Sequence, residues 1–142
     1  MSNDTSTITE ADKKMKLSVA TRANPNYVTG RRAFFKYQEL GVTEATNGRM
    51  RAQITAAEQG MSKETGWHYH VCEMQLVYMV KGWLDLEFED RVVRLHEGDT
   101  MMIPGGERHN ETKTSDAFEL LEVSVPADMG TVACEAPAKR AS

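Results

Sequence analysis

Three histidines at two places in the chain have the residue type and the spacing of a metal site. His68 and His70 are separated by one residue, and His109 follows in a distant segment. In a β-strand, residues two apart point to the same face, so His68 and His70 can offer both imidazoles to one ion. A third imidazole from the distant segment would complete a set that holds a divalent metal.

The residues around the first pair resemble the first motif of the cupin superfamily, which runs G-x5-H-x-H-x(3,4)-E-x6-G. The chain matches this motif at His68, His70 and Gly82. It departs from the motif at two positions. Ser62 stands where the first glycine is expected, and Gln75 stands in the place of the glutamate.

The segment around the third histidine resembles the second cupin motif, G-x5-P-x-G-x2-H-x3-N. Gly98, Pro104, Gly106 and His109 match, and Lys113 replaces the final asparagine. The resemblance implies an all-β fold, the double-stranded β-helix that is also called a jelly-roll or cupin barrel. Cupins host many unrelated activities, so the resemblance says much less about function than about fold.

The resemblance also implies a ligand set of His68, His70, Gln75 and His109 for one divalent transition metal per chain. Imidazole nitrogens and an amide oxygen suit Fe, Mn, Ni or Zn, and the sequence does not choose among them. Two alternatives stay open: Gln75 is a fourth ligand, or the site consists of the three histidines. On the residues alone, Gln75→Glu is expected to keep the fold and to tighten metal binding, because a carboxylate is the stronger ligand for a hard cation.

Neutral ligands would leave the ion its full positive charge, which favours an anionic or enolisable ligand. We therefore expect a metal-dependent enzyme, dioxygenase-like or lyase/isomerase-like, that acts on a small anionic, oxygen-rich molecule. The alternative is a non-catalytic cupin in which the metal anchors a small molecule for binding or sensing.

Catalytic residues cannot be identified from the sequence. Glu73, beside the ligand strand, and Tyr78 are candidates for a general acid or base, and a solvated loop or packing between subunits would explain them equally well. Arg51 and Gln53 would bind a carboxylate if their face of the strand is the inner one. His96 matches no motif position and is expected at an exposed strand end.

The length of 142 residues predicts one domain. We expect an N-terminal arm over residues 1–22, the barrel over 23–126, and an irregular C-terminal tail over 127–142. Alternating apolar and polar residues predict strands at 49–56 and 83–89. Further strands are expected at 92–95 and 118–125, with a tight turn at 89–91.

Bulk properties exclude several classes of partner. A formal net charge of −4 argues against nucleic acid or an anionic membrane as the main partner. The longest apolar run, 76–80, is far shorter than the roughly 20 residues that span a bilayer. The first residues lack the apolar core of a signal peptide, which predicts a cytoplasmic protein. Cys72 and Cys134 are too few for a disulfide scaffold.

Residues 75–80 predict a homodimer. If Gln75 faces the interior, Leu76, Tyr78 and Val80 point outward and form an apolar face that must be covered. A second subunit is the natural cover, and loops or the N-terminal arm are the alternative.

Overall fold

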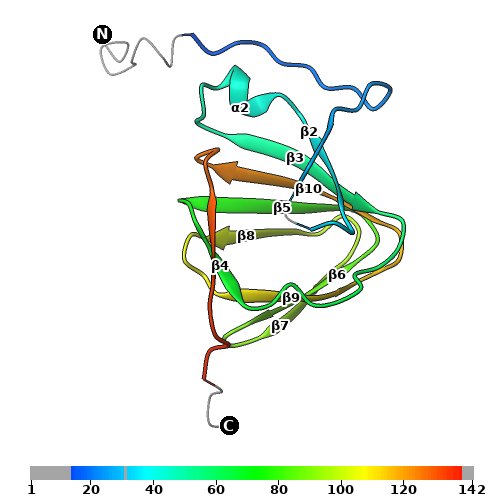
Figure 1. The fold of residues 1–142 in the computed structure, drawn as a ribbon, viewed down its shortest axis with the longest axis vertical. Helices are drawn as coiled ribbons and strands as arrows, with labels where there is room; N and C mark the ends of the chain where they lie inside the picture. The colour runs from blue at the N-terminus through cyan, green and yellow to red at the C-terminus, as the bar shows by residue number, and fades with distance from the viewer. Residues whose placement is uncertain (1–13, 31, 139–142) are drawn as a thin grey trace.

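The computed structural model describes residues 14–30 and 32–138, which fold into two antiparallel sheets that face each other (Figure 1). The six-stranded sheet contains, in order across it, β1 (Tyr27–Val28), β2 (Lys36–Glu39), β3 (Arg51–Ala57), β10 (Phe118–Val125), β5 (Met74–Lys81) and β8 (Thr100–Pro104). The five-stranded sheet contains β11 (Gly130–Ala133), β4 (His68–Val71), β9 (His109–Thr114), β6 (Leu84–Phe88) and β7 (Val92–Leu95). This is the jelly-roll architecture that the motif resemblance predicted.

The strands that the sequence predicted are present, and the ends of the two predicted from alternation shift by one or two residues. The strand expected at 49–56 is β3, the one at 83–89 is β6, and those at 92–95 and 118–125 are β7 and β10. The turn at 89–91 joins β6 to β7, where the Phe88 amide donates to the Arg91 carbonyl at 2.7 Å.

The inner faces of the two sheets enclose the hydrophobic core. On β5, Val77 and Met79 are buried, whereas Leu76 and Tyr78 are exposed, as the sequence predicted. The core cluster contains seven buried side chains: Val77, Met79, Leu84, Leu86, Leu95, Phe118 and Leu120. It fills the space between the sheets beside the histidines and forms the floor of the functional site.

Strand β3 turns its polar face inward. Arg51, Gln53 and Thr55 lie on the inner face of the six-stranded sheet, and Ile54 lies on the outer face beside Leu121 of β10. Alternation alone left this orientation open, because a polar face usually points to water. Here the interior next to β3 is a polar cavity, so the polar face is the inner one.

The C-terminal tail differs from the irregular arm that we expected. Residues Gly130–Ala133 form β11, which pairs with β4 in register, so that Thr131 lies opposite His70. The expectation was wrong for these residues because small and polar side chains gave no strand signal, whereas the free edge of β4 supplies backbone partners. A four-residue helix, α2 (Val42–Ala45), was also not predicted.

The expected N-terminal arm is described only in part, since residues 1–13 lie outside the described residues. Residues 14–22 are exposed and pass beside α2 in Figure 1, where the Lys16 amide donates to the Ala45 carbonyl at 2.8 Å. Arg22 forms an ion pair with Glu119 of β10 at 3.0 Å. The proposed boundaries at residues 22 and 126 stay predictions.

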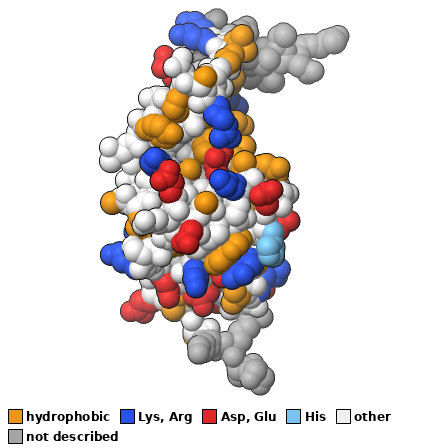
Figure 2. Space-filling model, turned by 90° about the vertical axis from the view of Figure 1, so that its right-hand side faces the viewer, with side chains coloured by type: hydrophobic (Ala, Val, Ile, Leu, Met, Phe, Trp, Pro, Cys, Tyr) orange, Lys and Arg blue, Asp and Glu red, His pale blue; other side chains and the backbone are white. Residues whose placement is uncertain are grey.

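Charges of both signs are interspersed over the face of the molecule in Figure 2, with hydrophobic side chains between them. That face therefore has no extended patch of positive or of negative charge. None of the helices in the described part of the chain has the length and apolar character needed to cross a membrane.

Two turns in contact hold the histidine strands at a fixed distance from the six-stranded sheet. The Gly105 amide, after β8, donates to the Glu73 carbonyl between β4 and β5 at 3.1 Å, and the Gly106 amide donates to the His70 carbonyl at 2.9 Å. A Cβ on Gly105 would overlap the backbone carbonyl of Cys72. Only glycine permits this approach.

Gly105→Ala should therefore lower the free energy of unfolding by about 1–3 kcal/mol, since backbone must move to accept the methyl group. Gly130→Ala is the matched control, because its Cβ would meet nothing closer than the Val71 side chain at 3.6 Å. We expect it to change stability by less than about 0.5 kcal/mol. Equal urea midpoints for Gly105→Ala and the parent protein would contradict the claim that this contact requires glycine at position 105.

Candidate functional site

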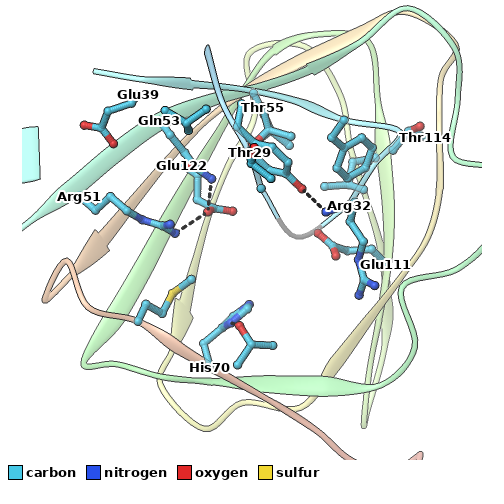
Figure 3. Close-up of a pocket in the computed structure, with 18 of the residues that line it drawn as sticks. Thr29, Arg32, Glu39, Arg51, Gln53, Thr55, His70, Glu111, Thr114 and Glu122 are labelled. Atoms are coloured by element: carbon cyan, nitrogen blue, oxygen red, sulfur yellow. Dashed lines mark hydrogen bonds and ion pairs between the residues drawn. The ribbon is translucent and has the colours of Figure 1, made fainter. Parts of the chain in front are cut away.

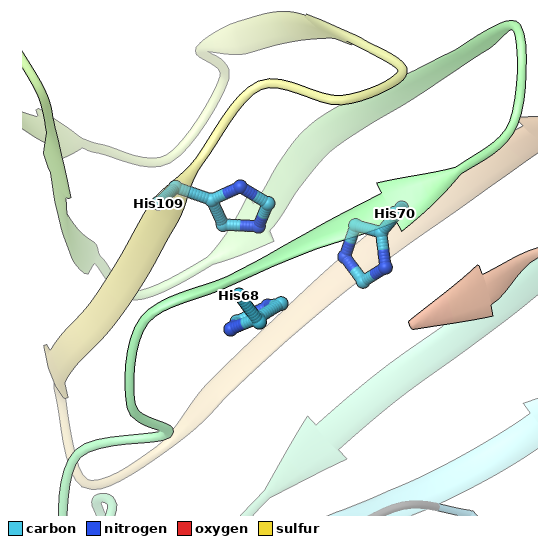
Figure 4. A group of neighbouring side chains, drawn as sticks. All are labelled: His68, His70 and His109. Atoms are coloured by element: carbon cyan, nitrogen blue, oxygen red, sulfur yellow. The ribbon is translucent and has the colours of Figure 1, made fainter. Parts of the chain in front are cut away.

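The three histidines that the motifs single out meet inside the barrel (Figure 4). His68 and His70 lie on β4, and His109 lies opposite His68 on the neighbouring strand β9. The ring centroids are 4.4 Å apart for His68 and His109, and 5.1 and 5.2 Å apart for the other two pairs. One ring nitrogen from each residue lies within 4.8 Å of the other two, and all three side chains are buried. This group is able to hold a metal ion.

The backbone orients two of the imidazole rings. Nδ1 of His68 lies 2.7 Å from the Gly66 carbonyl, and Nδ1 of His109 lies 2.9 Å from the Glu107 carbonyl. A carbonyl oxygen only accepts, so in both rings Nδ1 donates its hydrogen and Nε2 carries the lone pair. This arrangement is typical of histidines that bind a metal through Nε2.

The C-terminal strand orients the third ring. Nδ1 of His70 lies 3.0 Å from Oγ1 of Thr131, on the strand that pairs with β4. Sequence reasoning missed Thr131, because a threonine in a polar tail carries no signal until β11 docks beside β4.

Asn110 holds the turn that precedes His68. Its side chain is buried, its oxygen accepts from the Gly66 amide at 3.0 Å, and its nitrogen donates to Glu64 at 2.7 Å and Glu87 at 2.9 Å. Gly66 has a φ of +87°, a conformation that glycine adopts readily. Asn110 therefore fixes the carbonyl that orients His68. It escaped the sequence analysis because it matches no motif position.

Gln75 is buried on the facing sheet, on the inner side of β5. It is a diagonal neighbour of Glu122 on the adjacent strand β10, and hydrogen bonding from its side chain opposes the rise that burial causes in the pKa of the Glu122 carboxyl. Its Oε1 atom is buried and has no hydrogen-bond partner among the described residues. An orphaned amide oxygen inside the barrel fits a fourth, neutral metal ligand.

A cavity of about 450 Å³ lies next to the histidines, and His68 and His70 are part of its wall (Figure 3). The six-stranded sheet contributes a polar wall of Arg51, Gln53, Thr55 and Glu122. Part of the remaining wall is apolar and is formed by Phe35, Leu84, Phe118, Leu120 and Met129. A small molecule with both an apolar part and polar oxygens would fit such a lining.

Glu122 is the centre of the polar wall. Arg51 contacts its Oε1 at 3.2 Å, and Nε2 of Gln53 donates to the same oxygen at 3.3 Å. Burial raises the pKa of the Glu122 carboxyl above its ordinary value, although the Arg51 guanidinium acts in the opposite direction. The sequence analysis did not identify Glu122, because only the pairing of β10 with β3 and β5 reveals its neighbours.

The two candidate acid/base residues lie away from this cavity. Glu73 is exposed in the turn between β4 and β5, and Tyr78 is exposed on the outer face of β5. Neither is part of the cavity wall. A role for either side chain in chemistry beside the histidines does not fit this placement. Cys72 is half-buried, and burial raises the pKa of its thiol, which disfavours the thiolate that binds metals.

Comparison with known proteins agrees with this fold. Residues 57–125 match the family model described as the cupin domain. Among solved structures, the polyketide cyclase RemF from Streptomyces resistomycificus is 19% identical over 86% of this chain and 90% of its own, with a TM-score of 0.67. KdgF from Halomonas sp. is 17% identical over 78% and 94%, with a TM-score of 0.64. No curated protein matches the sequence.

A longer enzyme contains a similar unit. Salicylate 1,2-dioxygenase from Pseudoaminobacter salicylatoxidans, solved in complex with gentisate, is 16% identical over 77% of this chain and 31% of its own, with a TM-score of 0.56. At these identities the structural likeness concerns the fold alone. The chain therefore has the cupin fold, and residues 57–125 match the cupin domain.

Thr131→Val should weaken divalent metal binding about 10- to 100-fold, because it removes the group that orients the His70 ring. Thr131→Ser keeps the hydroxyl and should bind like the parent protein. Val132→Thr is the control, since Val132 is the partly exposed neighbour on the other face of β11. Competition titration with a metal indicator measures all four affinities. If Thr131→Val binds metal as tightly as Thr131→Ser, Thr131 does not orient His70.

Proposed function

We propose that the protein is a metal-dependent cupin enzyme that holds one divalent ion with His68, His70, Gln75 and His109. The observation that carries this proposal is the convergence of three buried imidazoles, two of which belong to the wall of a cavity large enough for a small molecule. Fe, Mn, Ni or Zn would suit these donors. When bound, the ion would act as a Lewis acid that polarises an oxygen of the substrate.

The orphaned Oε1 atom of Gln75 supports its place as the fourth ligand. The alternative is a site of three histidines alone, in which this buried oxygen has no partner among the described residues. An unsatisfied buried acceptor is costly, so the four-ligand set is the better account.

The cavity wall favours a small anionic, oxygen-rich substrate. Arg32 and Arg51 both belong to the wall, and the Nε atom of each is buried without a hydrogen-bond partner among the described residues. These donors suit a carboxylate, an enolate or a phenolate. Three carboxyl groups, those of Glu39, Glu111 and Glu122, also line the cavity, but with the divalent ion the site keeps a net positive charge.

The positions of polar side chains favour catalysis over simple binding. Glu122, Glu111 and Tyr37 are all part of the cavity wall, so groups that can accept or donate a proton lie close to a bound molecule. The sequence alone identified no such group, and the lack of one would favour a binding or sensor protein. We therefore propose an enzyme of the dioxygenase or the lyase/isomerase type. The gentisate complex of salicylate 1,2-dioxygenase is an example of an oxygen-rich aromatic acid bound by a protein with a similar unit.

The metal prediction is tested with histidine variants. Protein purified without a histidine tag should contain close to one divalent ion per chain by elemental analysis. His68→Ala and His109→Ala should each lose the ion and keep the β-sheet circular dichroism spectrum. His96→Ala is the matched control and should keep the ion, because the His96 side chain is exposed at the end of β7. Full metal content in both site variants would show that the ligand assignment is wrong.

We also propose that the protein is a homodimer that buries the outer face of the six-stranded sheet. Leu76 and Tyr78 of β5 are exposed there together with Met74 and, on the edge strand β8, Met102. Leu76 pairs with Met102 on one side and with Val123 of β10 on the other, so the apolar surface crosses three strands. An apolar patch of this kind is typical of a surface that a second subunit covers.

Leu76→Lys should convert the dimer to a monomer, because the lysine places a charge in the centre of the buried patch. Val92→Lys is the control, since Val92 is an exposed apolar residue on the other sheet and should leave the dimer intact. Light scattering at tens of micromolar reports the mass of each protein. A monomeric parent protein would contradict the proposal.

A further inference from the structure

Position 75 has an amide where the cupin motif has a carboxylate, and a carboxyl group lies beside it on the adjacent strand. Gln75 lies opposite Ser124 in the pairing of β5 with β10, and Glu122 lies two residues from Ser124. Residues two apart share a face of the sheet, so Gln75 and Glu122 are diagonal neighbours on the inner face, within reach of long side chains. Burial raises the pKa of the Glu122 carboxyl, and hydrogen bonding from the Gln75 side chain acts against that rise, which agrees with this placement.

The chemistry of this contact determines how the Gln75 amide is oriented. An ionised carboxylate only accepts hydrogen bonds, and Glu122 already accepts from Arg51 and Gln53. The Gln75 contribution to the bond is therefore its N–H group. This leaves Oε1 turned away from Glu122, and Oε1 is the atom that is buried without a partner.

We propose that Gln75 and Glu122 act as one unit. In this unit the Gln75 amide is the metal ligand, and the Glu122 carboxylate accepts a hydrogen bond from that amide. Glu122 is a positioning residue: it fixes the amide so that Oε1 is available to the ion, and its charge increases the electron density on that oxygen. The inference rests on the proposed metal site. It also explains the absence of glutamate at position 75, because a second carboxylate there would contact Glu122 inside the barrel.

This contact changes what Gln75→Glu should do. From the sequence alone, the substitution was expected to keep the fold and to tighten metal binding. With Glu122 in place, it brings two carboxylates into contact in a buried wall and removes an N–H donor, which destabilises the protein. Glu122→Gln should remove the fixed acceptor, so that the Gln75 amide is no longer held in one orientation.

The double variant Gln75→Glu/Glu122→Gln exchanges the two groups and restores one carboxylate and one amide in contact. The first measurement is thermal unfolding of chelator-stripped proteins, which does not depend on metal. We expect Gln75→Glu to lower the melting temperature by several degrees and the double variant to recover most of that loss. If Gln75→Glu does not fold at all, a folded double variant shows the same coupling.

The second measurement is calorimetric titration of Mn²⁺ and Zn²⁺ into the stripped proteins. Glu122→Gln should weaken binding about 10- to 100-fold, and the double variant should bind at least as tightly as the parent protein. Glu119→Gln is the matched control: it makes the same change on the same strand, but Glu119 pairs with Arg22 and not with Gln75. It should leave metal affinity unchanged.

The outcomes separate this inference from the proposed function. A parent protein that binds neither ion overturns the metal site, whereas the melting temperatures still test the coupling. A parent protein that binds metal, together with a double variant whose losses equal the sum of the single losses, overturns the Gln75–Glu122 unit alone.

Discussion

The antiparallel pairing of β4 with β9 is the constraint on which the rest of the site depends. It sets His68 opposite His109, and the alternation of β4 places His70 on the same inner face. Burying three imidazoles together has a cost unless their polar atoms have partners. The Gly66 and Glu107 carbonyls and the Thr131 hydroxyl supply partners on the outer side of the rings, so that the opposite nitrogens converge.

The two sheets contribute different parts of the site. The five-stranded sheet provides the imidazoles and their supports, and the six-stranded sheet provides the amide of Gln75 and the polar wall around Glu122. Their separation is held by the contact between the turns at Cys72 and Gly105, where no side chain fits. Gly105, which lies between the motif residues Pro104 and Gly106, therefore serves the geometry of the site.

The sequence predicted the elements whose signal is local. Alternation identified β3 and β6, and the motif spacing identified the three histidines that the structure brings together. It did not predict β11, because the strand character of Gly130–Ala133 comes from the free edge of β4 and not from its own side chains. Thr131, Asn110 and Glu122 were missed for a related reason. Each acts on a residue that is distant in the sequence, and only strand pairing brings the two together.

Anomalous X-ray diffraction from crystals of the metal-loaded protein tests the central claim most directly. Data collected on both sides of the absorption edge of the bound metal locate the ion without reference to any assumed ligand. The account predicts one strong peak per chain, surrounded by Nε2 of His68, His70 and His109 and by Oε1 of Gln75. A peak outside this group, or a bound ion with Gln75 Oε1 turned away from it, would contradict the account.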